Sequence, residues 1–187
     1  DVDTDKLISM MVGRDIKDIY PPLPAAGEKT VLEVQRFGRK GVFRDVSFKV
    51  HAGEILGLAG MVGAGRSEIV EALFGLSEAD EGNVLLEGKE TKIMSVKDAI
   101  RNGIAMVTED RRSYGFVGVR SISDNVILPN GDLYSKHGFW NRKKLRKGVE
   151  EICGKISVKA PGTDTVVENL SGGNQQKVVL AKWLVRD

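Results

Sequence analysis

The sequence is short of several features, and each shortage removes a class of protein. One cysteine, Cys153, occurs among 187 residues, so no disulfide can form within the chain and a cysteine-rich zinc module is excluded. No apolar run approaches the roughly 20 residues that a membrane-spanning helix needs, and we find no secretory signal peptide. A net charge of +2 and no interleaving of basic and aromatic residues argue against nucleic acid as a partner.

The rest of the composition is that of a globular domain. Hydrophobic residues make up 41% of the chain and charged residues 29%, so one domain with a sizeable core is expected. Cys153 is then expected to be a core residue of a helix. Neither His51 nor His137 is assigned a role. The first residue is Asp1 rather than Met, which favours a segment of a longer protein.

The most informative motif is the run Leu-Ser-Gly-Gly-Asn-Gln-Gln over residues 170–176, which precedes an expected helix over 175–185. A serine and two glycines at the start of a helix leave backbone N–H groups free to bind an anion, and the helix dipole adds to that preference. The side chains of Asn174 and Gln175 are expected to add neutral donors. The alternative is a glycine-rich helix cap without a ligand.

A second loop of this kind lies at residues 60–67 and reads Gly-Met-Val-Gly-Ala-Gly-Arg-Ser. It fits the phosphate-binding pattern G-x-x-x-x-G-K-[ST] except that Arg66 stands in place of lysine. A buried strand is expected over 54–59 and a helix over 65–74, with the Ser67 hydroxyl available to Mg²⁺. The alternative is a tight strand-to-helix turn. The candidate nucleotide-binding residues are Gly60, Gly63, Ala64, Gly65, Arg66, Ser67 and Glu68.

Together the two loops make the chain resemble the nucleotide-binding domain of an ABC transporter. Residues 53–68 and 170–177 are similar to the second ATP-binding domain of bacterial importers for ribose, galactose and xylose, and the likeness runs from about Leu7 to the last residue. Arg66 and Asn174 are typical of that second domain. The arginine keeps the charge of lysine but is a larger planar group, which favours a degenerate site that aligns phosphates poorly for hydrolysis.

This resemblance implies an α/β fold, a P-loop NTPase of ABC type with an antiparallel β subdomain and a helical signature subdomain. Residues 1–29 are expected to be an interdomain linker with a short helix, and residues 30–187 a partial ATP-binding domain whose helical subdomain covers about 114–180. The Walker B carboxylates and switch histidine of the family are not found after Gln176. The domain is therefore expected to be incomplete at its C-terminus, with no confident catalytic residue and little hydrolysis by this chain alone.

Two further positions take a role from the resemblance. Phe37 is a candidate for stacking on adenine, with Phe43 as the second candidate and core packing as the alternative. Glu109 stands where the family has a glutamine that binds Mg²⁺, so Ser67 and Glu109 are the candidate metal ligands. In a competing interpretation, residues 104–110 are a Walker B strand of a different P-loop NTPase, which would leave the Ser-Gly-Gly loop unexplained.

The function implied is ATP binding and hydrolysis coupled to monosaccharide uptake, with ATP and Mg²⁺ as cofactors. Ser171, Gly172 and Gly173 would act in trans on the γ-phosphate held by a second ABC ATP-binding domain fused in the parent chain. Membrane permease subunits, and indirectly a periplasmic sugar-binding protein, are the other partners, at the cytoplasmic face of the bacterial plasma membrane. The alternative is a non-hydrolytic module for nucleotide sensing or dimerisation. The sequence does not indicate which sugar is moved.

Periodicity predicts the remaining elements. Strands are expected at 31–34, 45–50, 82–87 and, as a buried strand, at 103–107. Ser95 and Asp98 resemble a capping box at the start of a helix. A helix from Asn141 places Leu145, Val149, Ile152 and Ile156 on one face. Its basic cluster over 141–147 is expected to be mainly a solvated surface, with contact to a membrane subunit as the alternative.

Overall fold

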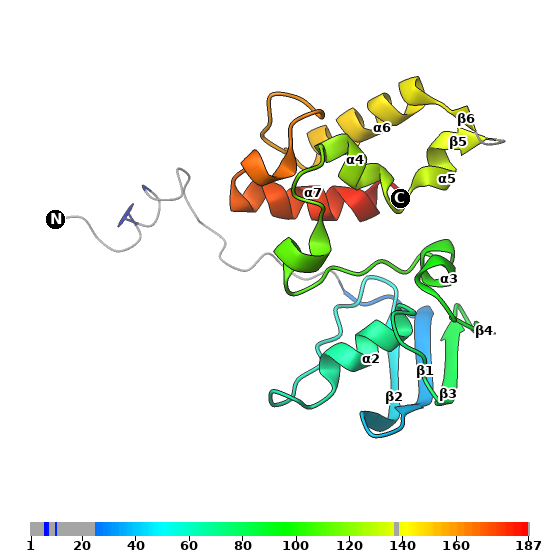
Figure 1. Cartoon of the computed structure of the whole chain (residues 1–187). Coiled ribbons are helices and arrows are strands. Elements are labelled where there is room, and N and C mark those ends of the chain that lie inside the picture. The colour runs from blue at the N-terminus through cyan, green and yellow to red at the C-terminus, as the bar shows by residue number, and fades with distance from the viewer. Residues whose placement is uncertain (1–5, 8–9, 11–24, 137–138, 187) are drawn as a thin grey trace. The chain divides into compact units, whose positions relative to one another are not determined.

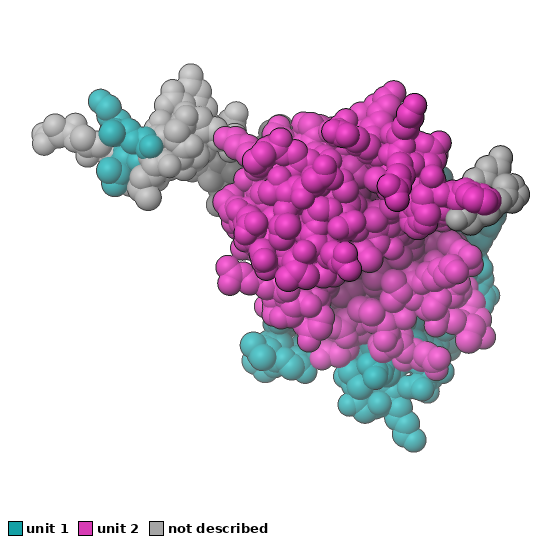
Figure 2. Space-filling view, turned by 45° about the horizontal axis from the view of Figure 1, so that its top comes forward, with its two compact units in different colours: residues 1–66, 79–91 teal, residues 67–78, 92–187 magenta. Residues whose placement is uncertain are grey.

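The computed structural model describes residues 6, 7, 10, 25–136 and 139–186. The chain divides into two compact units, shown in different colours in Figure 2. Unit 1 comprises residues 1–66 and 79–91, and unit 2 comprises residues 67–78 and 92–187. Most of the linker expected at 1–29 lies outside the described residues, as does His137.

Unit 1 is built on a four-stranded antiparallel sheet in the order β2-β1-β3-β4 (Figure 1). The strands are β1 (Thr30–Arg39), β2 (Phe43–His51), β3 (Glu81–Leu86) and β4 (Lys89–Glu90). Val34 of β1 lies opposite both Phe48 and Val84, and the apolar side chains Val34, Phe37, Phe43 and Val84 are buried. The three strands predicted in this region are therefore confirmed, each within a few residues of its expected span.

Gly82 is required where β3 crosses an irregular part of β1. Its φ of +89° lies in the left-handed region that favours glycine, and a Cβ there would overlap the carbonyl oxygen of Arg36. Beside it, the pairing of β1 with β3 shifts between Gln35 and Gly38. The glycine thus permits the close approach of two backbones at this bulge.

Helix α2 (Arg66–Leu73) follows, as expected, the glycine-rich loop of residues 60–67, which we call the P-loop. Ile69, Leu73 and Phe74 are buried, whereas Val70, which helical spacing would place on the same apolar face, is 40% exposed. In unit 2, the ring of Phe74 packs edge-on against Trp183, with 5.7 Å between ring centroids. This edge-to-face geometry is one that aromatic pairs favour.

Unit 2 is mainly helical (Figure 1). Its elements are α3 (Val96–Arg101), the π-helical turn η1 (Arg111–Gly115), α4 (Ile122–Ile127), α5 (Gly131–Tyr134), β5 (Ser135–Lys136), β6 (Phe139–Trp140), α6 (Arg142–Lys155), the 3₁₀ turn η2 (Val167–Asn169) and α7 (Gly172–Leu184). Helices α4 and α6 pack on α7, and the core between them consists of Ile122, Val126, Val149, Ile152, Cys153, Val167, Val178 and Ala181.

The periodic face of α6 is confirmed. Val149 and Ile152 are buried in the core, and Ile156 packs against it. Asn141 caps the helix, because its side-chain oxygen accepts the Lys144 backbone N–H at 2.9 Å. The cap predicted at the start of α3 is confirmed in one half: the Ser95 hydroxyl accepts the Asp98 N–H, but the Asp98 carboxylate accepts the Ser95 hydroxyl at 2.7 Å and not the Ser95 backbone N–H of a full capping box.

The prediction of buried strands at 54–59 and 103–107 is wrong for this structure. Both segments lack regular secondary structure, and neither pairs with a strand among the described residues. A strand needs a hydrogen-bonded neighbour, and an apolar run alone does not supply one. Ile55 is consequently 78% exposed and Val107 50% exposed.

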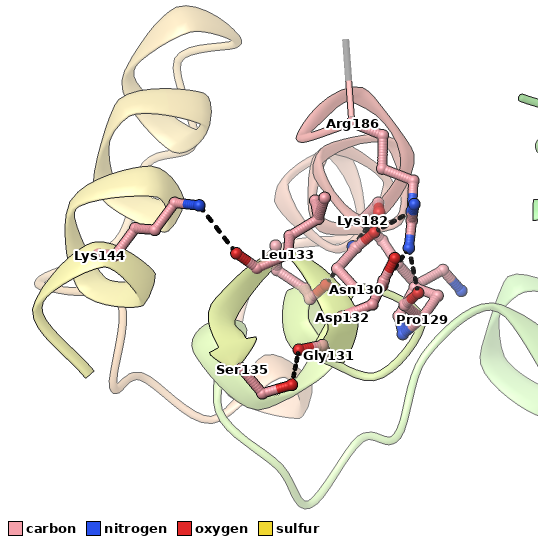
Figure 3. Close-up of polar contacts among 10 residues, drawn as sticks. Pro129, Asn130, Gly131, Asp132, Leu133, Ser135, Lys144, Lys182 and Arg186 are labelled. Atoms are coloured by element: carbon pink, nitrogen blue, oxygen red, sulfur yellow. Dashed lines mark hydrogen bonds and ion pairs between the residues drawn. The ribbon is translucent and has the colours of Figure 1, made fainter. Parts of the chain in front are cut away.

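A buried polar network joins α5 to the end of α7 (Figure 3). Asn130, fully buried, donates to the carbonyl oxygens of Val126 at 2.6 Å and Lys182 at 2.7 Å. Its own side-chain oxygen accepts from Nε of Arg186 at 2.7 Å. Arg186 also donates to the Pro129 carbonyl at 3.1 Å and pairs with Asp132. Asn130 therefore satisfies polar groups that burial would otherwise leave unpaired.

Cys153 is buried as expected, and burial raises the pKa of its thiol. We predict that iodoacetamide modifies the folded chain more than about tenfold more slowly than the urea-unfolded chain at pH 8, because both thiolate fraction and access are lower. Since the thiolate is the nucleophile, the rate should rise as pH increases toward the raised pKa. Mass spectrometry of the quenched reaction measures both rates, and equal rates would contradict a buried position.

No helix within the described residues is both long enough and apolar enough to cross a membrane.

Candidate functional site

The first candidate site is the start of α7. The helix begins at Gly172, three residues before its predicted start, so both glycines of the motif lie in its first turn. Ser171 occupies the N-cap position with φ −61° and ψ 153°, but its side chain accepts no hydrogen bond from the backbone of that turn. Ser171 and Gly173 are exposed. The first-turn N–H groups are therefore left without a side-chain cap, which is the arrangement that binds an anion.

Asn174 holds this loop in shape. Its amide nitrogen donates to the Ser171 hydroxyl at 2.9 Å, and its side-chain oxygen accepts the backbone N–H of Lys159 at 2.9 Å. Both halves of the amide are thus used within the protein. Asn174 fixes the orientation of the serine hydroxyl, a positioning contribution that differs from the free donor expected from the sequence.

The expectation that Gln175 offers a donor at the loop surface is corrected by its burial. The residue is 7% exposed, and its amide nitrogen points at the carbonyl oxygens of Leu170 and Val167, at 3.1 and 3.3 Å. A glutamine three residues into a helix can turn toward the chain that enters it, and this one does so. Gln175 therefore secures the segment before the motif instead of facing a ligand.

Helix α7 also contacts the segment that follows Glu109. Arg111 donates to the Gln176 side-chain oxygen at 3.2 Å. Gly115 lies so close to Val179 that an added Cβ would come within 3.1 Å of it, and the Lys182 ammonium donates to the Gly115 carbonyl at 2.7 Å. Burial lowers the pKa of Lys182. We call these three contacts the α7 clamp; nothing in the sequence pattern indicated them.

The P-loop glycines adopt the backbone that the motif requires. Gly63 and Gly65 have φ of +81° and +80°, and the Ala64 N–H donates to the Met61 carbonyl at 3.1 Å. Positive φ alternating with ordinary residues turns successive N–H groups toward a common point, as in anion-binding nests. At the tip of the loop Val62 is fully exposed.

Close packing bears on Gly60, whereas Gly65 is accounted for by its positive φ. In unit 1, a Cβ on Gly65 would meet the Val42 carbonyl at 3.4 Å, and one on Gly60 would meet the Ala64 side chain at 3.0 Å. The side chains of Arg66 and Ser67, which follow, are exposed, while Glu68 is half-buried. The loop thus leaves its charged and hydroxyl groups accessible to a phosphate and its cation.

Phe37 is 5% exposed and packs against Phe43 with 5.6 Å between ring centroids. Neither ring presents an open face in the sheet. The geometry favours the core-packing alternative for both residues, and stacking of Phe37 on adenine stays a prediction.

Glu109 is exposed at the edge of a pocket of about 300 Å³ that Arg111, Arg112 and Gln176 also line. Its neighbour Asp110 caps η1: the carboxylate accepts the N–H groups of Arg112 and Ser113 and the Ser113 hydroxyl, and these bonds hold the pKa of Asp110 below its ordinary value. Asp110 is thus committed to structure, whereas Glu109 is exposed, and its binding of a cation stays a prediction. The Walker B alternative is not supported, because residues 104–110 form no strand.

Whether this protein can hold a metal ion depends on the side-chain donor atoms that lie close together. Among the described residues no group of three or more His, Cys, Asp or Glu side chains converges on one point. Ser67 and Glu109 would supply at most two protein ligands, so their joint binding of an ion stays a prediction, and such an ion would take its remaining ligands from phosphate and water. Mg²⁺ bound with a nucleotide is of that kind.

A larger cavity of about 880 Å³ opens in unit 2 between α3, η1, α5 and the end of α7. Its lining combines cationic side chains, Lys97, Arg101, Lys182 and Arg186, with the apolar Phe116 and Trp183. Buried Asn125 supports one wall, since its side chain accepts the Val117 N–H at 2.7 Å and donates to the Val117 carbonyl at 3.0 Å. No pattern in the sequence predicted this cavity.

Comparison with known proteins finds relatives over most of the chain. The family profile described as "ABC transporter" matches residues 43–187. A protein of Rhizobium etli named "putative ribose/galactose/methyl galactoside import ATP-binding protein 1" is 48% identical over 182 residues, which is 97% of this chain and 35% of the relative. The ribose import ATP-binding protein RbsA of Lacticaseibacillus paracasei is 45% identical over 98% of this chain and 37% of the relative. The chain thus spans about a third of the length of these relatives.

Solved structures show the same fold. The cbiO1 protein of Clostridium perfringens superposes with a TM-score of 0.66 at 21% identity, covering 84% of this chain and 62% of that one. The ADP conformation of MJ1267, an ATP-binding cassette of an ABC transporter, also gives a TM-score of 0.66, at 19% identity, with 83% of this chain and 65% of that one covered. The predicted fold class, an ABC-type ATPase with an antiparallel sheet and a helical part, is confirmed.

Proposed function

The chain belongs to the ABC transporter family of ATPases, and from that premise we propose that it forms an ATP-binding part of a bacterial monosaccharide importer. The names of its relatives, which import ribose and galactosides, support this choice of substrate class. The importer's full activity, coupling of ATP binding and hydrolysis to sugar uptake, belongs in this proposal to the assembled transporter.

The observation that carries the proposal is the open N-terminus of α7. Ser171 and Gly173 are exposed, the serine hydroxyl is oriented by Asn174, and no side chain caps the first turn. Such a surface binds a terminal phosphate through backbone N–H groups and one hydroxyl. In this proposal it acts in trans, on a nucleotide held by a second ABC ATP-binding domain.

The P-loop supplies a second, weaker nucleotide site. Its backbone is formed, Arg66 offers a positive charge to the phosphates, and Ser67 and Glu109 would hold Mg²⁺. Because Arg66 replaces a compact ammonium with a planar group, and Glu109 adds a negative charge near the metal, we propose that this site binds Mg-ATP and turns it over slowly. A module that only senses nucleotide is the second candidate, and the same two residues favour it.

Membrane permease subunits and a periplasmic sugar-binding protein, the latter indirectly, complete the proposed assembly at the cytoplasmic face of the bacterial plasma membrane. The cavity of about 880 Å³ in unit 2 is a suitable docking site for a permease segment, because it joins apolar walls to the cations Lys97 and Arg101. Mutation of Arg101 should then weaken association with the permease without changing nucleotide affinity.

Mg-ATP binding and phosphate release, measured on one purified sample, test the proposal. We predict that Arg66→Ala weakens binding of a fluorescent ATP analogue about 5- to 10-fold, the loss expected for one charge-assisted contact at an exposed site. Arg66→Lys, the matched control, keeps the charge and should retain most of the affinity. Binding without release would favour the sensing module, and unchanged affinity in Arg66→Ala would refute a nucleotide site at this loop.

A further inference from the structure

The hairpin of β5 and β6 exposes two aromatic rings. Phe139 is 81% exposed and Trp140 is 55% exposed, although both are large apolar side chains. They are consecutive residues of one strand, so their side chains project to opposite sides of it. Strand β6 therefore carries an exposed ring on each side, with Trp140 partly against Gly131, and we call Phe139 and Trp140 the wedge.

Hydrogen bonds hold this wedge in place. Trp140 pairs with Ser135 across the hairpin, and the N–H of Asn141 donates to the Tyr134 carbonyl at 2.8 Å. Beneath it, Lys144 Nζ donates to the Leu133 carbonyl at 2.9 Å and Ser135 Oγ to the Gly131 carbonyl at 2.8 Å (Figure 3). The rings are thus carried on an anchored hairpin between two helices.

The residues that follow the wedge carry positive charge at the start of a helix, a position where positive charge destabilises the helix. Arg142, Lys143 and Lys144 occupy the first turn of α6, which contains no acidic residue. Cations are unfavourable there, because the helix dipole places positive charge at the N-terminus. Arg142 and Lys143 have no carboxylate partner among the described residues, whereas Arg146 and Lys147, one turn later, pair with Glu150 and Glu151. The charges of Arg142 and Lys143 are therefore available to an outside partner.

We propose that Phe139, Trp140, Arg142 and Lys143 form a docking surface for an anionic lipid membrane. Aromatic side chains partition to the boundary between headgroups and hydrocarbon, and adjacent lysines and arginines are attracted to anionic headgroups. A narrow wedge enters this boundary without a complementary pocket, which a protein partner would have to provide. The surface lies apart from both phosphate-binding loops in sequence and rests on no nucleotide contact, so it stands or falls separately from the proposed function.

Co-sedimentation of the purified full chain with vesicles tests the proposal. We expect binding to vesicles of phosphatidylglycerol and phosphatidylcholine, little binding to pure phosphatidylcholine, and weakening as salt increases. Phe139→Ser and Lys143→Glu should each lower the partition coefficient roughly fivefold or more, the change that corresponds to about 1 kcal/mol per cation near an anionic surface. The emission of Trp140 should shift to shorter wavelength on binding.

Two matched variants serve as controls. Lys155→Glu makes the same charge change at the other end of α6, and Val119→Ser removes a side chain that is 70% exposed elsewhere in unit 2. Both should bind vesicles as the unmodified chain does. Equal binding to neutral and anionic vesicles, equal loss in Lys155→Glu and Lys143→Glu, or binding only when a permease is present in the vesicle would overturn the proposal, the last by assigning the surface to a protein. Circular dichroism of each variant confirms that it is folded.

Discussion

Replacing Ser171 by arginine is expected to lower the ATPase activity of the assembled transporter by about 100-fold or more. The residue is exposed at the N-cap of α7, where the structure leaves the first-turn N–H groups open. An arginine there removes the hydroxyl that Asn174 orients and places a long side chain where a phosphate would bind. Loss of one well-placed donor to a developing charge costs about 100- to 1,000-fold in rate in other enzymes.

The same substitution should leave nucleotide binding by the chain itself almost unchanged. If the loop acts in trans, nucleotide affinity at the chain's own P-loop should stay within about twofold, since the substitution touches no residue of that loop. Asn169→Arg is the matched control: it adds the same charge at an exposed position two residues away, outside the first turn of α7, and should keep most of the activity. Equal loss in both variants would indicate a general electrostatic effect and contradict the specific role of Ser171.

Replacing Asn130 by alanine is expected to lower the free energy of unfolding of unit 2 by about 3–4 kcal/mol. The side chain is fully buried, and its removal leaves two carbonyl oxygens and Nε of Arg186 without this partner, although the same guanidinium keeps its bonds to Pro129 and Asp132. Each unsatisfied buried polar group costs about 1–3 kcal/mol, and more for a charged one. With a typical urea m-value of about 2 kcal/mol per molar, the midpoint should fall by about 1.5–2 M.

Tryptophan fluorescence is a suitable probe, because both tryptophans of the chain, Trp140 and Trp183, lie in unit 2. Asn102→Ala is the control: like Asn130, Asn102 donates from its amide to the carbonyl four residues earlier, but it is exposed. Its midpoint should shift by less than about 0.5 M, since water replaces the lost bond. A similar shift in both variants would show that burial of the Asn130 network contributes little.

The sequence predicted the local elements well where a short pattern determines them. The face of α6, the cap at Ser95 and the glycine-rich turn before α2 each depend on residues within a few positions of one another, and each is present in the structure. The loop at Ser171 was also found at the right place, because serine and glycine at a helix start have a strong local preference.

What the sequence could not predict depends on partners far along the chain. Residues 54–59 and 103–107 look like strands, but whether an apolar run becomes a strand is decided by a neighbour that pairs with it. The inward orientation of the Gln175 side chain was not predicted for a related reason: its acceptors are backbone carbonyl oxygens, which every residue carries. The same holds for Asn130, whose partners Lys182 and Arg186 lie more than fifty residues away.

The α7 clamp has a thermodynamic consequence. Arg111 and Lys182 bind the segment after Glu109 to the helix that Ser171 begins, so a shift of that segment moves the start of α7 with it. If an ion bound beside Glu109 changes the affinity of this helix for a phosphate, the phosphate must change the affinity for the ion by the same factor. The two ligands, which need never touch, would then bind as a cooperative pair whose coupling can be read from either one.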